Sequence, residues 1–327
     1  MKFTLAIAAL SAIASVTSLS IPQVDQARVL KRNLFENLAK RQSVTSGVDD
    51  VTILNFALTL EHLEATFYAQ ALEKFDQNCF DEKGYYGLRP LLQQVAMDEA
   101  EHVTFLTTAL KAAGAPAVSA CNYTFPYTDV PDFLALAQAV ENVGVSAYLG
   151  AAAAINESAY LTAAGSILTV EARHNAFFRL INHYTPFPQP FDTPLDARSV
   201  VTIVSPFFKS CPSGSAPTIP GFPALTVSST NNHIGSQLSI APTNASAVNT
   251  QGTVYCGFAS GLSTGFSTWS NGKCQIPTQN VTEQGQSYVW LTKGPSVADA
   301  SVLAGPAIID TSYQNVSVSI PALKSSN

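Results

Sequence analysis

Residues 91–110 read LLQQVAMDEAEHVTFLTTAL, and their apolar residues recur at the three- and four-residue spacing of an amphipathic helix. Glu99 and His102 are three residues apart, so a helix places both side chains on one face. Val95 and Leu106 lie on the same face, which predicts that the pair points into the core. One isolated Glu-x-x-His match is more often a solvated helix edge, so its meaning depends on the rest of the chain.

A second stretch repeats this spacing. Residues 167–181 read ILTVEARHNAFFRLI, and Glu171 and His174 are again three residues apart on an apolar face. Two further predicted helices each carry one glutamate among apolar neighbours, Glu61 and Glu141. The sequence therefore predicts four helices that each direct a carboxylate toward a common core.

The ends of these four helices are marked by residues that start and stop helices. Acidic residues precede the helices, Pro90 stands in a first turn and Gly114 follows a last turn. The predicted ranges are about 49–75, 89–113, 129–155 and 157–183. Long helices joined by moderate loops build a four-helix bundle, which we assign to residues 42–190.

The composition of the chain changes in residues 191–327. Past residue 200, Ser, Thr, Asn, Gly and Pro dominate, and short β-prone runs appear. These runs are ALTVS, GTVYCGF, SYVWLTK and NVSVSI. We expect a linker followed by an antiparallel β domain, a small sandwich, so the fold class is mainly α plus β. The proline-rich link PFPQPFDTP at 186–194 marks the boundary and either packs on the bundle or stays free of it.

The first 41 residues have the features of segments removed during export. Residues 1–20 combine one lysine, a short apolar run and small residues, as a secretory signal peptide does. Residues 21–41 contain two Lys-Arg pairs and resemble a propeptide. We expect a secreted protein, extracellular or associated with the cell wall. No later stretch is apolar over the roughly 18 residues of a membrane helix, so no transmembrane segment is expected.

The charge of the chain argues against a nucleic-acid partner. The formal net charge is -6, and residues 1–41 carry six Lys/Arg and two Asp/Glu, so their removal moves the charge to about -10. Five Asn-x-Ser/Thr sequences are potential glycan acceptors in an exported chain, and one of them adjoins a helix end. They start at Asn122, Asn244, Asn280, Asn315 and, beside the helix end, Asn156.

The five cysteines predict two disulfides and one free thiol. Cys79 and Cys121 fall in loops that flank one helix, and Cys256 and Cys274 bracket a Gly/Ser-rich hairpin. We expect these two pairs, with Cys211 left over.

Four carboxylates that face one another in a core require positive charge between them. A buried, unpaired carboxylate costs several kcal/mol, and neighbouring carboxylates repel. Two histidines cannot balance this charge, whereas two iron or manganese ions can, because such ions accept carboxylate oxygens and neutral imidazole nitrogens. Glu64 lies one turn from Glu61 and is an alternative or additional ligand. One Glu from each of two helices and Glu-x-x-His from the other two is the ligand pattern of di-metal helical bundles.

Residues 49–184 resemble the ferritin-like superfamily, and residues 54–72, LNFALTLEHLEATFYAQAL, are similar to secreted fungal ferritin-like proteins. That family includes proteins linked to starvation, stress and late sexual development, with relatives among plant desiccation-related proteins. The resemblance implies bridging roles for Glu99 and Glu171 and a catalytic role for Tyr68 near the metals. The remaining ligands that it implies are Glu61, His102, Glu141 and His174.

The resemblance also implies redox chemistry with dioxygen or peroxide. Ferrous oxidation, peroxide removal and oxidation of an organic substrate all fit the site, and the sequence does not choose among them. Tyr68 and Tyr148 each follow a ligand glutamate by seven residues, although aromatic residues on a helix face are more often core. The alternative to an enzyme is a structural cell-wall or matrix protein that keeps the fold and makes contacts through the β domain.

Overall fold

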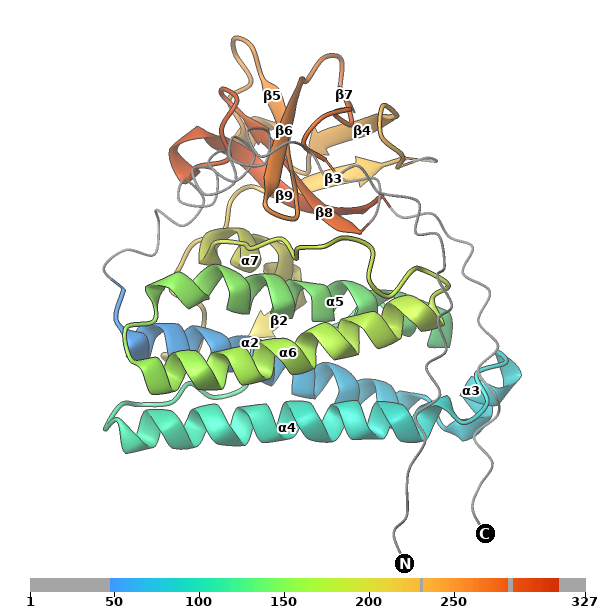
Figure 1. Cartoon of the computed structure of the whole chain (residues 1–327), viewed down its shortest axis with the longest axis vertical. Coiled ribbons are helices and arrows are strands. Elements are labelled where there is room, and N and C mark those ends of the chain that lie inside the picture. The colour runs from blue at the N-terminus through green and yellow to red at the C-terminus, as the bar shows by residue number, and fades with distance from the viewer. Residues whose placement is uncertain (1–47, 230–231, 282–284, 312–327) are drawn as a thin grey trace, which may run out of the picture.

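The computed structural model describes residues 48–229, 232–281 and 285–311 (Figure 1). The expected signal peptide, the expected propeptide, the NVSVSI run and the Asn315 acceptor lie outside these residues. Figure 1 places the β-rich part over the side of the bundle that carries α5 and α7, with α4 on the opposite side. No helix in the described ranges is long and apolar enough to cross a membrane.

The four predicted helices are present, and their ends fall within a few residues of the predicted ones. They are α2 (Asp50–Lys74), α4 (Leu88–Ala112), α5 (Val130–Ala151) and α6 (Ser158–Ile181). Asp49 and Asp129 cap α2 and α5 by accepting backbone N–H groups of the first turn, as expected of acidic N-caps. Helix α2 packs mainly on α4, and α5 mainly on α6. The helical part thus consists of two helix pairs, α2 with α4 and α5 with α6, that share one interior.

Several shorter helical segments lie between the long helices and in the C-terminal part, and none of them is among the predicted helices. The α-helical ones are α3 (Gln77–Glu82) and α7 (Ala197–Val204). The 3-10 segments are Ala152–Ala154, Ser205–Phe207, Ala245–Ala247 and Asp299–Ser301. Helix α7 is capped by Asp196, which accepts from the backbone of Ser199, and it lies between the bundle and the β-rich part.

The C-terminal part contains two antiparallel sheets, as predicted. The first has the order β3-β4-β7, and the second the order β6-β5-β8-β9. Leu238 of β4, Phe258 of β5 and Leu291 of β8 belong to one buried apolar cluster, so the two sheets pack on a common core. The strands are β3 (Leu225–Ser228), β4 (Gln237–Pro242), β5 (Tyr255–Ser260), β6 (Ser263–Thr268), β7 (Lys273–Gln275), β8 (Gln286–Thr292) and β9 (Val302–Asp310).

The second face of the four-stranded sheet packs on the bundle. Tyr288 and Trp290 of β8 share a buried cluster with Val143 of α5 and Val200 of α7. The Tyr288 hydroxyl also lies 2.8 Å from Oγ of Ser146. Both faces of β8 are therefore buried, which explains why its middle, YVWL at 288–291, is a continuous run of aromatic and apolar residues instead of an alternating one.

The proline-rich link contacts the β-rich part, where the N–H of Gly261 donates to Oγ1 of Thr193 at 2.7 Å, and its end is held on the bundle. The N–H of Leu195 donates to the carbonyl of Ser146 at 3.0 Å, which fixes the end of the link on α5. At Gly150, an added Cβ would lie 1.8 Å from the carbonyl oxygen of Leu195. Glycine is required there because only a residue without a side chain allows the two backbones to approach so closely.

One of the two predicted disulfides is correct. Cys256 bonds to Cys274, but Cys121 bonds to Cys211, and Cys79 is a half-buried free cysteine. The wrong pair has a clear physical cause. The short strands β1 (Asn122–Tyr123) and β2 (Phe208–Ser210) pair antiparallel and bring together two cysteines that are 90 residues apart. Strands of two or three residues carry no periodic signal in the sequence.

Candidate metal centre

The six predicted ligands come from all four long helices, and all six side chains are buried in the middle of the bundle. Helices α2 and α5 contribute one glutamate each, and α4 and α6 contribute one glutamate and one histidine each. They are Glu61, Glu99, His102, Glu141, Glu171 and His174. The four glutamates have no exposed surface.

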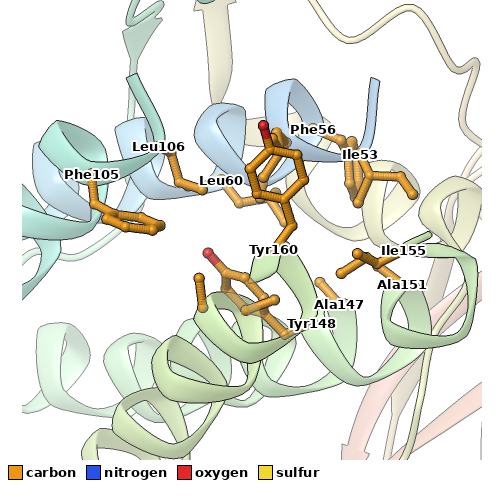
Figure 2. Close-up of a pocket in the computed structure, with 14 residues that line it drawn as sticks. Ile53, Phe56, Leu60, Phe105, Leu106, Ala147, Tyr148, Ala151, Ile155 and Tyr160 are labelled. Atoms are coloured by element: carbon orange, nitrogen blue, oxygen red, sulfur yellow. The ribbon is translucent and has the colours of Figure 1, made fainter. Parts of the chain in front are cut away.

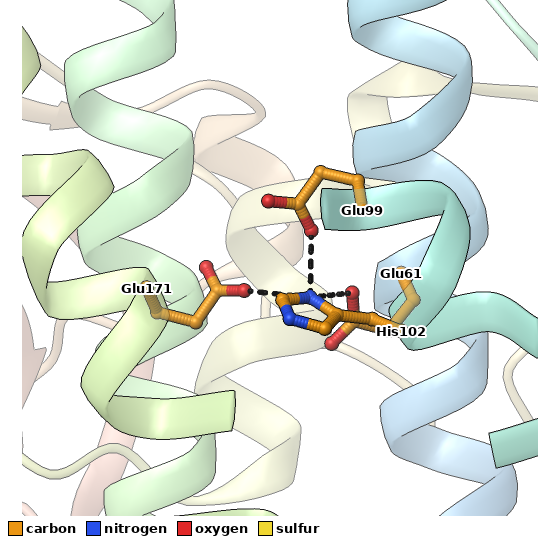
Figure 3. Close-up of side chains that lie close together, drawn as sticks. All are labelled: Glu61, Glu99, His102 and Glu171. Carbon is orange, nitrogen blue, oxygen red and sulfur yellow. Dashed lines mark hydrogen bonds and ion pairs between the residues drawn. The ribbon is translucent and has the colours of Figure 1, made fainter. Parts of the chain in front are cut away.

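One group of four surrounds the ring of His102, as Figure 3 shows. Its Nδ1 lies 3.2 Å from Oε2 of Glu61 and 3.1 Å from Oε2 of Glu99. Oε1 of Glu171 lies 3.4 Å from the same nitrogen. One ligand atom from each of the four residues falls within 4.8 Å of the others. Three carboxylates and one imidazole nitrogen thus converge on one point.

A second group of four surrounds His174. Its Nδ1 lies 2.9 Å from Oε1 of Glu99 and 3.4 Å from Oε2 of Glu141. Glu171 completes this group, again within 4.8 Å. Glu99 and Glu171 belong to both groups, whereas Glu61 and Glu141 each belong to one. Two glutamates are thus shared by the groups and two are not, as the bridging and terminal roles implied by the resemblance would require. Metal binding and the ligand roles stay predictions.

Two tyrosines connect the helix pairs through the terminal carboxylates. The hydroxyl of Tyr68 on α2 donates to Oε1 of Glu141, and the hydroxyl of Tyr148 on α5 donates to Oε1 of Glu61. Burial and the neighbouring carboxylates raise the pKa of both tyrosines well above the ordinary value, so each keeps its proton. Each tyrosine therefore has a ring in the apolar core and a hydroxyl on a predicted ligand of the other helix.

The cluster holds protons in the absence of a cation. Burial raises the pKa of Glu61 to about 7, and contacts with His102 offset only part of this effect. Burial and like-charge repulsion raise the pKa of Glu171 well above its usual range. Burial alone lowers the pKa of both histidines, but their contacts with carboxylates outweigh it and raise the values to about 12 for His102 and about 11 for His174.

Glu64, the alternative ligand, lies beside the cluster and outside both groups of four. It is 3% exposed, and burial followed by repulsion from Glu171 raises its pKa well above the usual range. Gly144 on α5 provides the space for it. A Cβ at Gly144 would lie 2.7 Å from Oε2 of Glu171 and 3.0 Å from Oε1 of Glu64. Gly144 follows Glu64 by 80 residues, the same separation as Glu61 and Glu141, so it takes the equivalent place in the second helix pair.

Asp98 is a contact of the site that sequence reasoning does not find. Its Oδ2 lies 3.2 Å from Nε2 of His174, on the side of the ring that faces away from the cluster. A carboxylate at this nitrogen fixes the orientation of a histidine ligand. Asp98 directly precedes Glu99 on α4 and is four residues from His102. The sequence alone therefore suggests that Asp98 has its partner on α4 itself. The contact across to α6 arises only from helix packing.

Several buried ligand atoms lack a hydrogen-bond partner among the described residues. They are Oε1 of Glu99, Oε2 of Glu141, both carboxylate oxygens of Glu171 and Nδ1 of His174. These atoms lie near one another without hydrogen-bond geometry, whereas nearly all buried polar atoms in proteins are hydrogen-bonded. A set of carboxylate oxygens and imidazole nitrogens suits iron or manganese. The residues therefore fit a metal centre.

The fold and the site define a ferritin-like helical bundle with a buried carboxylate–histidine cluster, followed by antiparallel β sheets. Residues 49–183 match the family model of the ferritin-like domain. The chain is also similar to Protein rds1 of Schizosaccharomyces pombe, with 28% identity over 178 residues. The matched part covers 54% of this chain and 44% of that protein, so the similarity extends over less than half of the relative's length.

Proposed function

We propose that the protein is a secreted oxidoreductase whose ferritin-like domain binds two iron or manganese ions and reacts with dioxygen or peroxide. The observation that carries this proposal is the pair of overlapping ligand groups that share Glu99 and Glu171. The buried ligand atoms without hydrogen bonds support it, because a bundle with a purely structural role would be more stable with apolar side chains at these positions.

Each residue of the site has a role that follows from its position. Glu99 and Glu171 would bridge the ions, while Glu61 with His102 and Glu141 with His174 would complete the two sets. Iron or manganese bound there supplies electron transfer to dioxygen or peroxide.

The surroundings of the ligands hold them in place. Asp98 orients the ring of His174, and Tyr68 and Tyr148 donate hydrogen bonds that fix the terminal carboxylates. Through these bonds both tyrosines lie next to the reacting centre, so each is positioned to hold or deliver a proton at a ligand oxygen.

Export, glycosylation and a role in stress or development are part of the proposal. The N-terminal sequence and two disulfides support export, and the acceptors Asn122, Asn244 and Asn280 are exposed. The resemblance to fungal ferritin-like proteins supports a role in stress or development. The second candidate is a structural cell-wall or matrix protein, which the fusion of a β sandwich to the bundle favours. This candidate tolerates a site without metal.

Metal analysis separates the two candidates. Inductively coupled plasma mass spectrometry of the secreted protein should find about two iron or manganese ions per chain. The Glu99→Gln/Glu171→Gln variant should lose both ions, because each glutamine removes a bridging anion without changing the size of the side chain. Glu101→Gln is the matched control, since Glu101 is exposed on the same helix and should leave the metal content unchanged. Absence of metal after anaerobic reconstitution would favour the structural candidate.

Replacing Gly144 with alanine should reduce metal affinity about tenfold or more. The new Cβ would overlap Oε2 of Glu171 and press on Glu64, so the bridging carboxylate must move. Gly165→Ala on α6 is the control, because a Cβ at Gly165 meets no atom within 4 Å. That variant should bind metal normally and gain about 1 kcal/mol of stability from the higher helix propensity of alanine. Equal metal titrations for the two variants would contradict the prediction.

A further inference from the structure

The two helix pairs of the bundle are related by a constant sequence separation. Glu141 follows Glu61 by 80 residues, and Tyr148 follows Tyr68 by the same 80. Helix α6 repeats α4 in the same way, because His174 follows His102 by 72 residues. Positions around one tyrosine therefore have equivalents around the other, and the two surroundings can be compared residue by residue.

Large aromatic rings fill the surroundings of Tyr68. The ring centroids of Phe67, Phe133 and Phe178 lie 5.1, 6.1 and 6.0 Å from that of Tyr68. All three phenylalanines are 0% exposed. Leu92 is fully buried in the same cluster. Large side chains therefore occupy the space around Tyr68.

Smaller side chains stand at the equivalent positions around Tyr148. Ala147 takes the place of Phe67, Ile53 that of Phe133, and Leu106 that of Phe178. Ala164 takes the place of Leu92. These four smaller residues and Tyr148 line a pocket between α2, α4, α5 and α6 (Figure 2). The pocket is thus the volume that three phenyl rings and a leucine occupy in the other half of the bundle.

The pocket is narrow and apolar. Its empty volume is about 470 Å³, a value that includes the open mouth. The phenol groups of Tyr148 and Tyr160 are the polar side-chain groups of its lining, and no charged side chain contributes to it. Phe105 is 46% exposed and also lines the pocket, so the pocket reaches the surface beside it. Apolar space of this kind favours apolar guests over water.

We propose that this pocket binds the organic substrate of the metal centre, a slim molecule with an unbranched hydrocarbon chain. The inference rests on the proposed function and names its substrate class. Tyr148 connects the two sites, because its ring lines the pocket and its hydroxyl donates to Glu61. A sugar or peptide would lose its hydrogen bonds to water here without gaining others, whereas a hydrocarbon chain loses none.

A pair of probes of equal length tests the chemistry of the pocket. 1-Octanol should bind the full secreted protein with one molecule per chain in isothermal titration calorimetry. Octane-1,8-diol should bind at least about tenfold more weakly, because its second hydroxyl exchanges water for a lining that is apolar except for two phenol groups. Equal affinity for the two probes, or no saturable binding of 1-octanol, would overturn the proposal.

Variants that copy the closed half of the bundle test the location. Leu106→Phe introduces the residue found at Phe178, and Ala164→Leu introduces the residue found at Leu92. Each should reduce 1-octanol affinity at least about tenfold while thermal melting shows a folded protein. Phe178→Leu changes the equivalent position at the Tyr68 end, so it should keep the wild-type affinity within about twofold. Unchanged binding in both filling variants would place the site elsewhere and refute the proposal.

Metal content of the same samples separates this inference from the proposed function. Two bound ions without 1-octanol binding would overturn the pocket proposal and leave the oxidoreductase standing. Selective 1-octanol binding without any metal would support the pocket as a site for hydrocarbon chains and refute the oxidoreductase alone.

Discussion

Replacing Asp310 with alanine is expected to lower the free energy of unfolding by about 3–5 kcal/mol. Asp310 ends β9, and its Oδ2 accepts from Nη1 of Arg179 at 2.9 Å and from Nε2 of Gln138 at 3.2 Å. Arg179 is 1% exposed on α6. Removal of the carboxylate takes away the anion that bonds the buried guanidinium. The contacts that remain, with the carbonyl of Thr185 and the charge of Asp192, offset less of its desolvation cost.

A second Asp–Arg pair in the same chain is the matched control. Asp299 lies 3.7 Å from Arg198, with about a quarter of its side chain and a third of that of Arg198 exposed. Asp299→Ala should therefore cost no more than about 1 kcal/mol. Urea unfolding followed by circular dichroism measures both variants. Similar losses for the two would show that the burial of Arg179 does not raise the cost, and the prediction would be wrong.

The Asp310 contact has a consequence for the architecture. It joins the last described strand of the β-rich part to α5 and α6, the helices that also carry Glu141 and His174. The apolar contact between β8 and the bundle reinforces this connection. We expect the helical and β-rich parts to unfold together in the wild-type protein. In Asp310→Ala, a separate earlier transition would indicate that the two parts have become independent.

The helices and the buried glutamate–histidine cluster are predictable because the information is local. Apolar spacing and capping residues define each helix, and the spacing of Glu99 to His102 and of Glu171 to His174 defines which face points inward. Four carboxylates that point inward then require a common, positively charged partner in the core, whatever the crossing angles of the helices. The structure brings the six residues together without any further sequence signal.

Contacts between helices are not predictable in this way. Asp98 contacts His174, and each tyrosine donates a hydrogen bond to a glutamate of another helix, only because of how the helices pack. The Cys121–Cys211 bond depends on the pairing of two very short strands. The space at Gly144 could have been found, because the 80-residue separation aligns it with Glu64.

The β-rich part shows a different limit of sequence reasoning. Its strands are predictable as short β-prone runs, but its position is not. The four-stranded sheet is covered on one face by the other sheet and on the second face by α5 and α7. A run such as SYVWLTK is compatible with any strand that is buried on both sides. No feature of the sequence identifies the elements that cover the two faces of the sheet.

Removing the metal should make stability strongly dependent on pH. The metal-free protein is expected to lose on the order of several kcal/mol of unfolding free energy between pH 5 and pH 9. Burial raises the pKa of Glu61 to about 7 in the folded state, above its ordinary 4.5. The stability from this proton is complete below pH 4.5 and is lost as the pH rises through 7.

The two histidines act in the same direction. Burial lowers their pKa, but contacts with carboxylates outweigh it, so the folded values are about 12 and about 11 against 6.5 when unfolded. Their contribution is complete below pH 6.5 and declines at higher pH. Glu99 acts in the opposite direction. Burial raises its pKa, but contacts with the histidines outweigh this and lower it to about 2, so its contribution is lost only below pH 4.5.

Bound cations should reverse this dependence, because they replace the protons that the cluster holds and bind more tightly as those protons leave. Thermal melting with ferrous or manganous ion and after chelation should show a difference in Tm that grows from pH 5 to pH 9. The Glu99→Gln/Glu171→Gln variant should melt at one Tm with or without metal, and with a flatter pH profile, since its histidines lose two anionic partners. A wild-type protein whose metal-free Tm is equal at both pH values would contradict the charge assignment. A wild-type protein that gains no stability from metal at pH 9 would contradict the metal centre itself.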